Sequence, residues 1–334
     1  MNKPIEARRP QRAPGSALVT GCAGFIGARL SERLVEEGRR VVGVDSFSPF
    51  YARELKERNL LSLSSEPAFE LRELDLAEAS LEGILDGIDA VFHLAGQPGA
   101  RQSFGPGARE CERNNAHATE RLLAEALRAK PRVFVHASSS TIYGEAATLP
   151  TPEDAPLAPI TPYGESKVAA ERAVARAGEH GLATVILRYF SGYGPRQRPD
   201  MAISRFIERI ALGQPVPLYG DGGQVRDFTY VDDLAEATLL AASRGRPGSV
   251  FNVGGGEPTS LDEVVRMLGD LLGVPAEIEL QPAPPGDARR TRADTSRAQA
   301  ELGFRASVPL AQGLAAQVDW ARGVTSAPAL GGRG

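Results

Sequence analysis

The sequence predicts an α/β fold in which a doubly wound parallel Rossmann sheet carries a smaller mixed α/β substrate-binding domain. Short apolar runs alternate with longer segments of helical period up to about residue 190, which is typical of a parallel sheet covered by helices on both faces. A glycine-rich turn, TGCAGFIG, directly follows the first apolar run, and beyond residue 190 glycine and proline break the pattern into short pieces. At 334 residues the chain has room for about two domains.

The expected elements alternate along the first half of the chain. Apolar runs predict strands at 17–20, 41–44, 90–94, 133–137 and 184–188, with a further strand just before residue 75. Helical spacing predicts one helix that ends near residue 37 and others at 113–128 and 165–179. In the second half we expect helices at about 201–212, 231–243 and 260–273.

Composition limits the classes of function. Lys and Arg number 38 against 42 Asp and Glu, and a net charge of −4 offers no basic face for a nucleic-acid backbone. No apolar run reaches the roughly 18 residues that a membrane span needs. Two cysteines, Cys22 and Cys111, cannot form a disulfide framework, and the four histidines lack metal-ligand spacing. We therefore expect a cytoplasmic protein without a metal ion.

The glycine-rich turn predicts a dinucleotide site. Gly21 permits the tight turn, Gly24 lets the backbone approach a pyrophosphate, and Gly27 allows close helix packing, with Phe25 and Ile26 between them. Asp45 closes the second strand, where a carboxylate accepts hydrogen bonds from both ribose hydroxyls and repels a 2′-phosphate. NAD is therefore expected rather than NADP.

Further cofactor contacts are expected where later strands end. Asp75 and Leu76 follow the third strand and would meet the adenine edge, and the segment Leu94, Ala95, Gly96 would pass beneath the pyrophosphate and ribose. Asn115 lies in the next helix, where its amide can bridge backbone groups of the central strands, and that role is as much structural as functional.

The fifth strand and the helix after it supply a catalytic set. Ser139 lies at the carboxyl end of that strand, and Tyr163 and Lys167, four residues apart at a helix start, share one face. A phenol is a poor base at neutral pH, but a nearby ammonium and a positive nicotinamide ring favour the phenolate. Tyr163 can then take the proton of a sugar hydroxyl, with Ser139 hydrogen-bonded to the same oxygen and Lys167 holding the nicotinamide ribose.

These motifs resemble the NAD-dependent epimerase/dehydratase family, an extended branch of the short-chain dehydrogenases/reductases, over about residues 16–325. The resemblance rests on TGCAGFIG, VFHLAG, SSSTIYG, YGESK, RYFSGYGPRQRPDMA, GDGGQVRDFTYVDDLAEA and FNVGGG. It implies a tightly held NAD, a UDP- or TDP-sugar substrate and transient oxidation at carbon 4 of the hexose.

The resemblance also implies how the chain is divided and assembled. We expect an NAD-binding domain at 16–190 plus about 226–255, a nucleotide-sugar-binding domain at about 191–225 plus 256–325, a disordered tail at 1–15 and a loose one at 326–334. A homodimer would form through the helices at about 113–128 and 165–179. Ala169, Ala173 and Ala177 make a small-residue stripe there, for which packing within one chain is the alternative.

Within the family, the residues after Ser139 favour epimerisation. Sugar 4,6-dehydratases normally carry an Asp-Glu pair at the positions of Ser140 and Thr141, because eliminating water requires a general acid and a general base. Sugar-acid decarboxylases usually keep a glutamate at the position of Thr141. Neither carboxylate is present, so reversible oxidation at carbon 4 remains.

The resemblance places the substrate contacts mainly in the second domain. Arg226 matches the arginine that grips the diphosphate, Asp287 matches a residue near the uridine ribose, and Leu218 and Tyr219 would line the base pocket. The family's frequent second arginine is here Pro284, so we expect Arg289 as a substitute, unless it is simply solvated. The remaining substrate-binding residues that we expect are Arg101, Ser140, Ser191 and Arg198.

Arg198 is expected to determine which sugar the enzyme accepts. The loop GPRQRPDM is similar to that of UDP-glucuronic acid 4-epimerases, and a substrate carboxylate requires a fixed cation. Ser191 and Thr141 would be lesser donors. The alternative is that Arg196 or Arg198 only forms a salt bridge across a surface loop.

Other functions stay open. They are 4-epimerisation of UDP-glucose and UDP-galactose or of a TDP-hexose, UDP-glucuronate decarboxylation, sugar dehydration, and NAD binding without catalysis. Intact Tyr163 and Lys167 argue against the last. His93 and His136 lie in apolar strands, where we expect them to be satisfied core residues.

Overall fold

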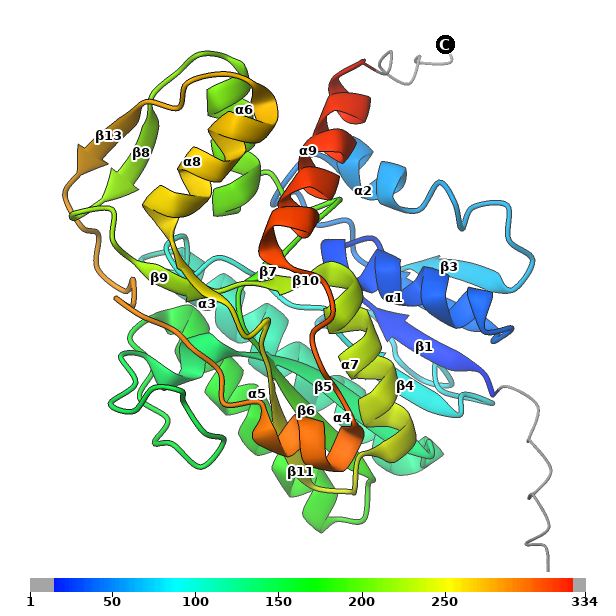
Figure 1. The fold of residues 1–334 in the computed structure, drawn as a ribbon. Coiled ribbons are helices and arrows are strands. Elements are labelled where there is room, and N and C mark those ends of the chain that lie inside the picture. The colour runs from blue at the N-terminus through cyan, green and yellow to red at the C-terminus, as the bar shows by residue number, and fades with distance from the viewer. Residues whose placement is uncertain (1–14, 327–334) are drawn as a thin grey trace, which may run out of the picture.

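A parallel sheet of seven strands forms the centre of the molecule (Figure 1). The computed structural model describes residues 15–326, so the two expected tails fall almost entirely outside the described residues. The strand order is β11-β6-β5-β4-β1-β2-β3, and every neighbouring pair is parallel. The strands are β1 (Ala17–Thr20), β2 (Val41–Asp45), β3 (Phe69–Glu73), β4 (Ala90–His93), β5 (Val133–Ser139), β6 (Thr184–Tyr189) and β11 (Ser249–Val253). The predicted strands and the doubly wound fold class are confirmed.

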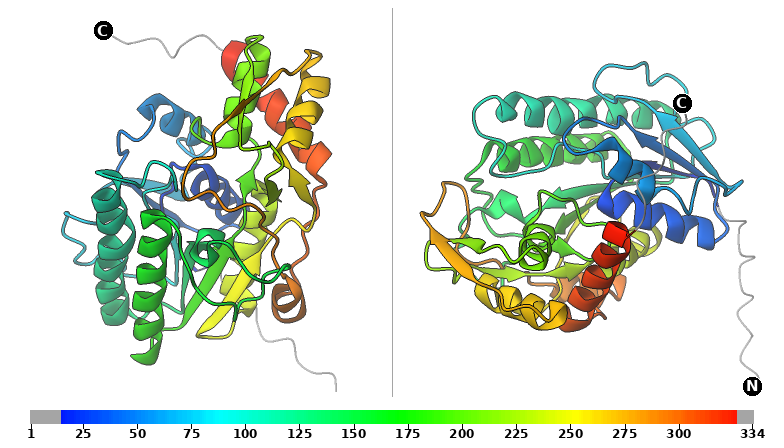
Figure 2. Two further views of the ribbon diagram at one scale, coloured as in Figure 1. Left: turned by 90° about the vertical axis from the view of Figure 1, so that its left-hand side faces the viewer. Right: turned by 90° about the horizontal axis from the view of Figure 1, so that it is seen from above.

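Helices cover both faces of the sheet because successive strand residues point to opposite sides. Val19, Phe92 and Val135 pack toward α1 (Phe25–Glu36) and α7 (Val231–Arg244). Val91 and Phe134 belong to the opposite cluster, with residues of α4 (Ala118–Ala129) and α5 (Pro162–Glu179). Figure 2 shows α4 and α5 side by side along the sheet. Both layers leave the carboxyl edge of the sheet free for loops.

The helix expected at 113–128 is longer and less regular than predicted. It begins with α3 (Gly107–Cys111) and continues as a π-helical segment, η1 (Glu112–His117), before α4. A π-bulge inserts one extra residue into the helical turn, and such bulges occur frequently at functional sites. The buried Asn115 lies in this segment.

A second, smaller unit rises from the carboxyl edge of the sheet (Figure 1). Its core joins residues of α6 (Ala202–Ala211), α8 (Leu261–Leu272) and α9 (Leu310–Ser326), among them Ile203, Leu268 and Leu314. The helices predicted at 201–212, 231–243 and 260–273 are confirmed, whereas α9 was not predicted. The short elements are β7 (Gly192–Tyr193), β8 (Val216–Tyr219), β9 (Val225–Asp227), β10 (Thr229–Tyr230), β12 (Pro258–Ser260), β13 (Ile278–Gln281), α2 (Arg53–Asn59), η2 (Ser140–Tyr143) and η3 (Ala298–Leu302).

The alanine stripe on α5 does not lie on the surface as a whole. Ala173 and Ala177 are buried in the chain's own core beside α4, and only Ala169 is exposed. The expected stripe is therefore wrong for two of its three members, because the packing of α5 on α4 already covers them.

The sequence raises expectations about membrane spans, cysteines and metal-ligand groups, and the structure bears on each of them. Between residues 15 and 326 no helix is long and apolar enough to cross a membrane. Cys22 and Cys111 are both free and buried. No group of three His, Cys, Asp or Glu side chains in the described chain is arranged to hold a metal ion.

A buried ion pair connects the end of the sheet to α5. Arg188 of β6 pairs with Glu171 at 2.8 Å, and both side chains are only 6% exposed. Arg188 also donates to the Tyr143 hydroxyl, which in turn donates to Asn252 at 2.7 Å. The network fixes the segment after Ser139 against two strands.

Removing one partner of this pair should destabilise the fold strongly, because the other charge would be left buried alone. We expect Glu171→Ala to lower the free energy of unfolding by about 3–5 kcal/mol, measured by urea denaturation. Arg176→Ala, which removes an exposed pair with Glu120 on the same helix, should cost less than about 1 kcal/mol. Equal losses in the two variants would contradict this account.

Candidate active site

The glycine-rich turn forms an anion site at the start of α1. Gly21 adopts a φ of +71°, and its N–H donates to the Val44 carbonyl at 2.7 Å. A Cβ on Gly27 would lie 2.0 Å from the Gly21 carbonyl oxygen, so only glycine lets the helix pack on the turn. No side chain caps α1 and its first turn holds no acidic residue, which leaves the N–H groups at its N-terminus for a phosphate.

The two residues between Gly24 and Gly27 differ in burial. The Phe25 side chain is 4% exposed and packs in the core of the second unit, so a cofactor contact of Phe25 must come from its main chain. Ile26 packs against the same core but is only partly buried.

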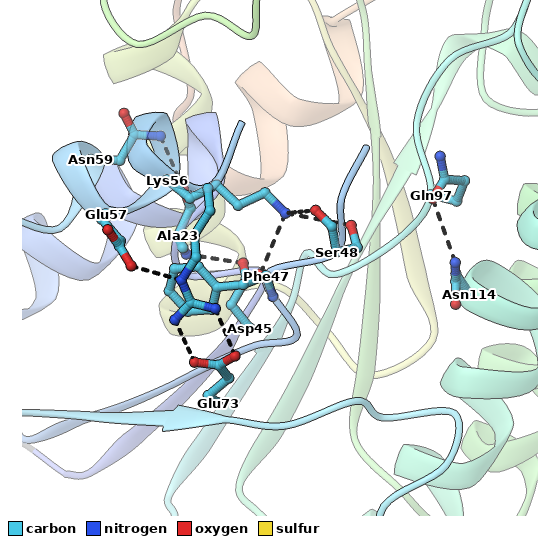
Figure 3. Close-up of polar contacts among 11 residues, drawn as sticks. Ala23, Asp45, Phe47, Ser48, Lys56, Glu57, Asn59, Glu73, Gln97 and Asn114 are labelled. Carbon is cyan, nitrogen blue, oxygen red and sulfur yellow. Dashed lines mark hydrogen bonds and ion pairs between the residues drawn. The ribbon is translucent and has the colours of Figure 1, made fainter. Parts of the chain in front are cut away.

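Asp45 lies between the glycine-rich turn and α2 (Figure 3). Its carboxylate accepts from the backbone N–H groups of Ala23 at 3.1 Å and Phe47 at 2.9 Å. The Lys56 ammonium lies 3.9 Å from it and donates to the Ser48 carbonyl at 2.9 Å. Burial raises the pKa of Asp45, and the charge of Lys56 acts in the opposite direction.

Lys56 was not predicted from the sequence. It stands in a polar helix, RELKERN, where the sequence does not distinguish it from an ordinary solvated lysine. The structure buries it to 4% exposure, and its ammonium lies 4.8 Å from the centre of the Tyr51 ring. Burial lowers the pKa of Lys56.

The other expected cofactor residues line the neighbouring strand ends. Ala95 donates its N–H to the Thr20 hydroxyl at 3.1 Å, and a Cβ on Gly21 would lie 2.9 Å from the Ala95 nitrogen. Leu94 and Gly96 flank it, and a Cβ on Gly96 would meet the Asn115 amide oxygen at 2.5 Å. This segment therefore lies directly beneath the turn.

Asp75, Leu76 and Asn115 already have partners within the protein. Asp75 forms an ion pair with Arg113 at 2.7 Å, and the Leu76 side chain is buried in the core beneath α4. Asn115 bridges loop and helix, because its amide bonds both backbone groups of Gln97 and the Ser166 hydroxyl at 2.8 Å. The expected bridging role of Asn115 therefore holds, but its partners are not the central strands.

Ser139, Tyr163 and Lys167 come together at the carboxyl end of β5. Thr141 donates its hydroxyl to the Ser139 oxygen at 3.0 Å, which leaves the Ser139 proton for Tyr163. The Lys167 ammonium donates to the Ala137 carbonyl at 2.5 Å. Burial lowers the pKa of Lys167 to about 8.

The groups that act on the pKa of Tyr163 differ from the expected nearby ammonium. Burial raises the pKa of its phenol, while the hydrogen bond from Ser139 and the positive charge of Arg198 act in the opposite direction. The charge that the protein directs at this phenol therefore includes Arg198 of the second unit.

Arg198 stands in the loop between β7 and α6, and its side chain is 18% exposed. Its Nε and Nη2 atoms donate to the two carboxylate oxygens of Asp200 at 2.9 and 3.0 Å. The salt-bridge alternative thus holds in part, but this pair is largely buried instead of crossing a solvated loop. Ser191, which follows β6, accepts the Thr229 N–H at its carbonyl and lies near the start of the same loop.

A second group of cations lies between the two units. The Asp287 carboxylate bridges Arg226 at 2.5 Å and Arg101 at 3.0 Å. The Arg101 guanidinium also lies 4.2 Å from the centre of the Tyr219 ring. Four of the expected substrate residues are therefore in contact.

Two expected substrate residues lie elsewhere. Arg289 is exposed, and its side chain forms a two-point ion pair with Asp221 at 2.7 Å. Among the residues that the structure describes, it meets the Arg101–Asp287–Arg226 cluster only through its backbone carbonyl, which accepts from Arg226 at 3.5 Å. Leu218 is 1% exposed and packs in the core of the second unit, because alternate residues of β8 face inward, so its side chain does not line a pocket.

The two histidines differ from each other. His93 is satisfied, as its ring nitrogens contact the hydroxyls of Thr20 at 2.7 Å and Thr119 at 2.8 Å. His136 is equally buried, but neither of its ring nitrogens has a partner in the described part of the chain. The expectation of a satisfied core residue is therefore wrong for His136, whose pKa burial lowers.

The family model for the NAD dependent epimerase/dehydratase family matches residues 17–254. The chain belongs to this family. The cofactor is therefore NAD, as predicted, and the chain is an enzyme of the NAD-dependent epimerase type.

Similar family members have different activities. The UDP-glucuronic acid 4-epimerase of Bacillus cereus, solved with UDP-glucuronic acid and NAD, has a TM-score of 0.90 at 36% identity and covers 92% of this chain and 99% of its own. A relative named as an uncharacterized UDP-glucose epimerase, YtcB of Bacillus subtilis, is 37% identical over 90% of this chain and 96% of its own. A dTDP-glucose 4,6-dehydratase of Streptomyces griseus is also 37% identical, over 91% and 93%.

The site of this family member fits NAD. The uncapped start of α1, the turn that a Cβ at Gly21 or Gly27 would obstruct, and the carboxylate of Asp45 match a pyrophosphate followed by a ribose. When bound, NAD accepts a hydride from the substrate and returns it.

Gly27→Ala should abolish NAD binding, since its Cβ would overlap the Gly21 carbonyl. We expect the wild-type enzyme to retain NAD through purification, as measured by chromatography of nucleotide released on denaturation, and the variant to retain less than about a tenth of it. Gly323→Ala, at a helical glycine whose Cβ would lie within 4 Å of no atom other than those of the adjoining helix in the described part of the chain, is the control and should keep full NAD content. NAD retained by Gly27→Ala would contradict this description of the turn.

Proposed function

We propose that the enzyme is a nucleotide-sugar 4-epimerase that interconverts UDP-glucuronate and UDP-galacturonate. The observation that carries this proposal is Arg198, a largely buried cation whose charge reaches the phenol of Tyr163. A neutral hexose needs no fixed cation at this place, whereas a hexuronate carboxylate does. The similar epimerase of Bacillus cereus, solved with UDP-glucuronic acid, supports this choice.

The catalytic residues move one proton and hold one oxygen. Tyr163 takes the proton of the 4-hydroxyl while the hydride leaves carbon 4, and it returns this proton when the hydride is delivered to the other face of the sugar. Ser139 hydrogen-bonds the same oxygen, and Lys167, fixed by the Ala137 carbonyl, holds the nicotinamide ribose. No net redox change occurs, so no external oxidant is needed.

The residues at the start of η2 argue against dehydration and decarboxylation. Ser140 and Thr141 stand where an acid–base pair would be required, and the Thr141 hydroxyl is engaged with Ser139. Although a dehydratase is among the relatives, Tyr163 is the group left here for proton transfer at the sugar.

We propose that Arg226 and Arg101 hold the diphosphate. Their positions on the two sides of Asp287 put two guanidinium groups within reach of one anion, and Arg101 replaces the arginine whose position Pro284 occupies. Tyr219 offers its ring to the uracil base, and Asp287 then faces the uridine ribose. Arg289 plays no part in this arrangement.

Arg198 would hold the hexuronate carboxylate. Oxidation of carbon 4 makes a β-keto acid, which loses carbon dioxide readily when the bond to the carboxylate stands perpendicular to the carbonyl plane. Asp200 uses the Nε and Nη2 side of Arg198, so the remaining edge of the guanidinium can bind the carboxylate away from that alignment, with Ser191 as a further donor. Contrary to the expectation, Thr141 is not a donor here, because its hydroxyl proton goes to Ser139.

The domain division and the homodimer are also part of the proposal. The NAD-binding domain would comprise residues 16–190 and about 226–255, and the nucleotide-sugar-binding domain about 191–225 and 256–325. A homodimer would use the outer faces of α4 and α5, where Ala169 is exposed. The cytoplasmic location stays a prediction.

Tyr163→Phe should remove the proton acceptor while NAD and UDP-sugar binding persist. We expect kcat to fall roughly 10²–10⁴-fold, measured by separating UDP-glucuronate from UDP-galacturonate. Binding of UDP, measured by calorimetry, serves as the control for an intact site. Retention of the rate within about tenfold would exclude Tyr163 as the base.

Arg198→Ala should weaken use of UDP-glucuronate by at least the roughly 1.5–3 kcal/mol of a charged hydrogen bond and release a pentose by-product. The measurement is kcat/KM together with the pentose fraction among the products. Arg209→Ala, in the last turn of α6, is the matched control. Two results would favour 4-epimerisation of UDP-glucose and UDP-galactose instead. One is that the wild-type enzyme epimerises UDP-glucose far faster than UDP-glucuronate, and the other is that Arg198→Ala leaves kcat/KM and the pentose fraction unchanged.

A further inference from the structure

The loop that carries Arg198 is held on both sides by side chains far away in the sequence. Arg196 adopts a φ of +69° and donates to Glu32 of α1 at 2.7 Å, which connects the loop to the first unit. Gln197, only 4% exposed, lies between these two arginines and points into the second unit. Its partner there is Gln317 of the C-terminal helix α9.

Gln317 is 1% exposed, and both ends of its amide are used. Its oxygen accepts the Gly194 N–H at 2.8 Å, and its nitrogen donates to the Gln197 amide oxygen at 2.8 Å. The side chain thus spans the loop from its first residue to the residue next to Arg198. A buried amide with both ends satisfied has a single favourable orientation.

Backbone groups fix the orientation of the second amide as well. The Gln197 nitrogen donates to the Gly192 carbonyl at 2.9 Å, and its oxygen accepts the Ser204 N–H at 3.0 Å. The Ser204 hydroxyl at the start of α6 adds a further contact with the Gln197 oxygen at 3.0 Å. The two amides therefore connect β7, the loop, α6 and α9 in one buried hydrogen-bonded network.

We propose that Gln317 is the positioning residue that sets the place of Arg198, so that the C-terminal helix determines how the enzyme holds the sugar. This inference rests on the proposed role of Arg198 as the carboxylate ligand. Without Gln317, the buried Gly194 N–H loses its hydrogen-bond acceptor, and the Gln197 oxygen keeps only its contacts with Ser204. The loop must then shift to give the Gly194 N–H a new partner. Within residues 15–326, no hydrogen bond of this network reaches the diphosphate cluster at Arg226 or the glycine-rich turn, so both should keep their geometry.

The test compares Gln317→Leu with Gln312→Leu, which places the same side chain at an exposed position of the same helix. In Gln317→Leu we expect KM for UDP-glucuronate to rise about 10- to 100-fold, as is typical of small displacements of a positioned group, and the pentose fraction to rise with it. UDP affinity and NAD content should stay within twofold of the wild type. Gln312→Leu should match the wild type in all four measurements.

The outcomes separate the two proposals. If the wild-type enzyme turns over UDP-glucuronate and a folded Gln317→Leu behaves like Gln312→Leu, the positioning role is refuted and the proposed function stands. If the wild-type enzyme does not use UDP-glucuronate, both are refuted. A parallel loss of UDP affinity and NAD content would show that Gln317 only stabilises the fold, which also refutes the positioning role.

A milder variant keeps the test decisive if Gln317→Leu fails to fold. Ser204→Ala removes the hydroxyl that contacts the Gln197 carbonyl at 3.1 Å and amide oxygen at 3.0 Å and accepts from the Gln317 amide at 3.3 Å. It leaves the hydrogen bond between the two amides and the Ser204 N–H in place. It should shift KM and the pentose fraction in the same direction by a smaller factor of about two to five. An unchanged KM and pentose fraction in Ser204→Ala would then refute the proposal.

Discussion

The parallel direction of all seven strands is the constraint on which the site depends. Because neighbouring strands run the same way, Gly21, Asp45, Leu94 and Ser139 all follow strand ends at one edge of the sheet. The covering helices bury the faces and leave this edge as the place where loops can meet a ligand. The second unit, inserted after β6 and β11, closes over the same edge and brings arginines to it.

Local rules explain which part of the site was predictable. The glycines of the turn, Asp45, Ser139 and the Tyr163–Lys167 pair follow from short-range requirements of backbone geometry and helical spacing, and the structure brings them together as expected. The strands up to β6 and the long helices other than α9 were equally predictable, since burial on one or both faces leaves a periodic pattern. The π-helical turn around Asn115 leaves no such pattern, as it differs from an α-helix by one inserted residue.

What could not be predicted depends on partners distant in sequence. In the sequence nothing distinguishes Arg289 from Arg101. In the structure, Arg289 pairs with Asp221 at the surface, whereas Arg101 pairs with Asp287 in the cluster. Leu218 and Tyr219 are neighbours on one strand, and the alternation of side chains buries the first while the second faces Arg101. The burial of Lys56 is concealed by its polar surroundings in the sequence, RELKERN, and no sequence pattern around Gln317 indicates its buried partners Gly194 and Gln197.

In the Arg101–Asp287–Arg226 bridge, one carboxylate offsets the charge of one of the two guanidinium groups. Two guanidinium groups held close together without a ligand would repel each other and attract any small anion of the cell. With Asp287 between them, much of that field is cancelled, and a single phosphate gains little by entering. In the proposed function, a diphosphate that reaches both arginines and also carries a ribose for Asp287 would gain more, so the bridge would discriminate against the abundant inorganic anions.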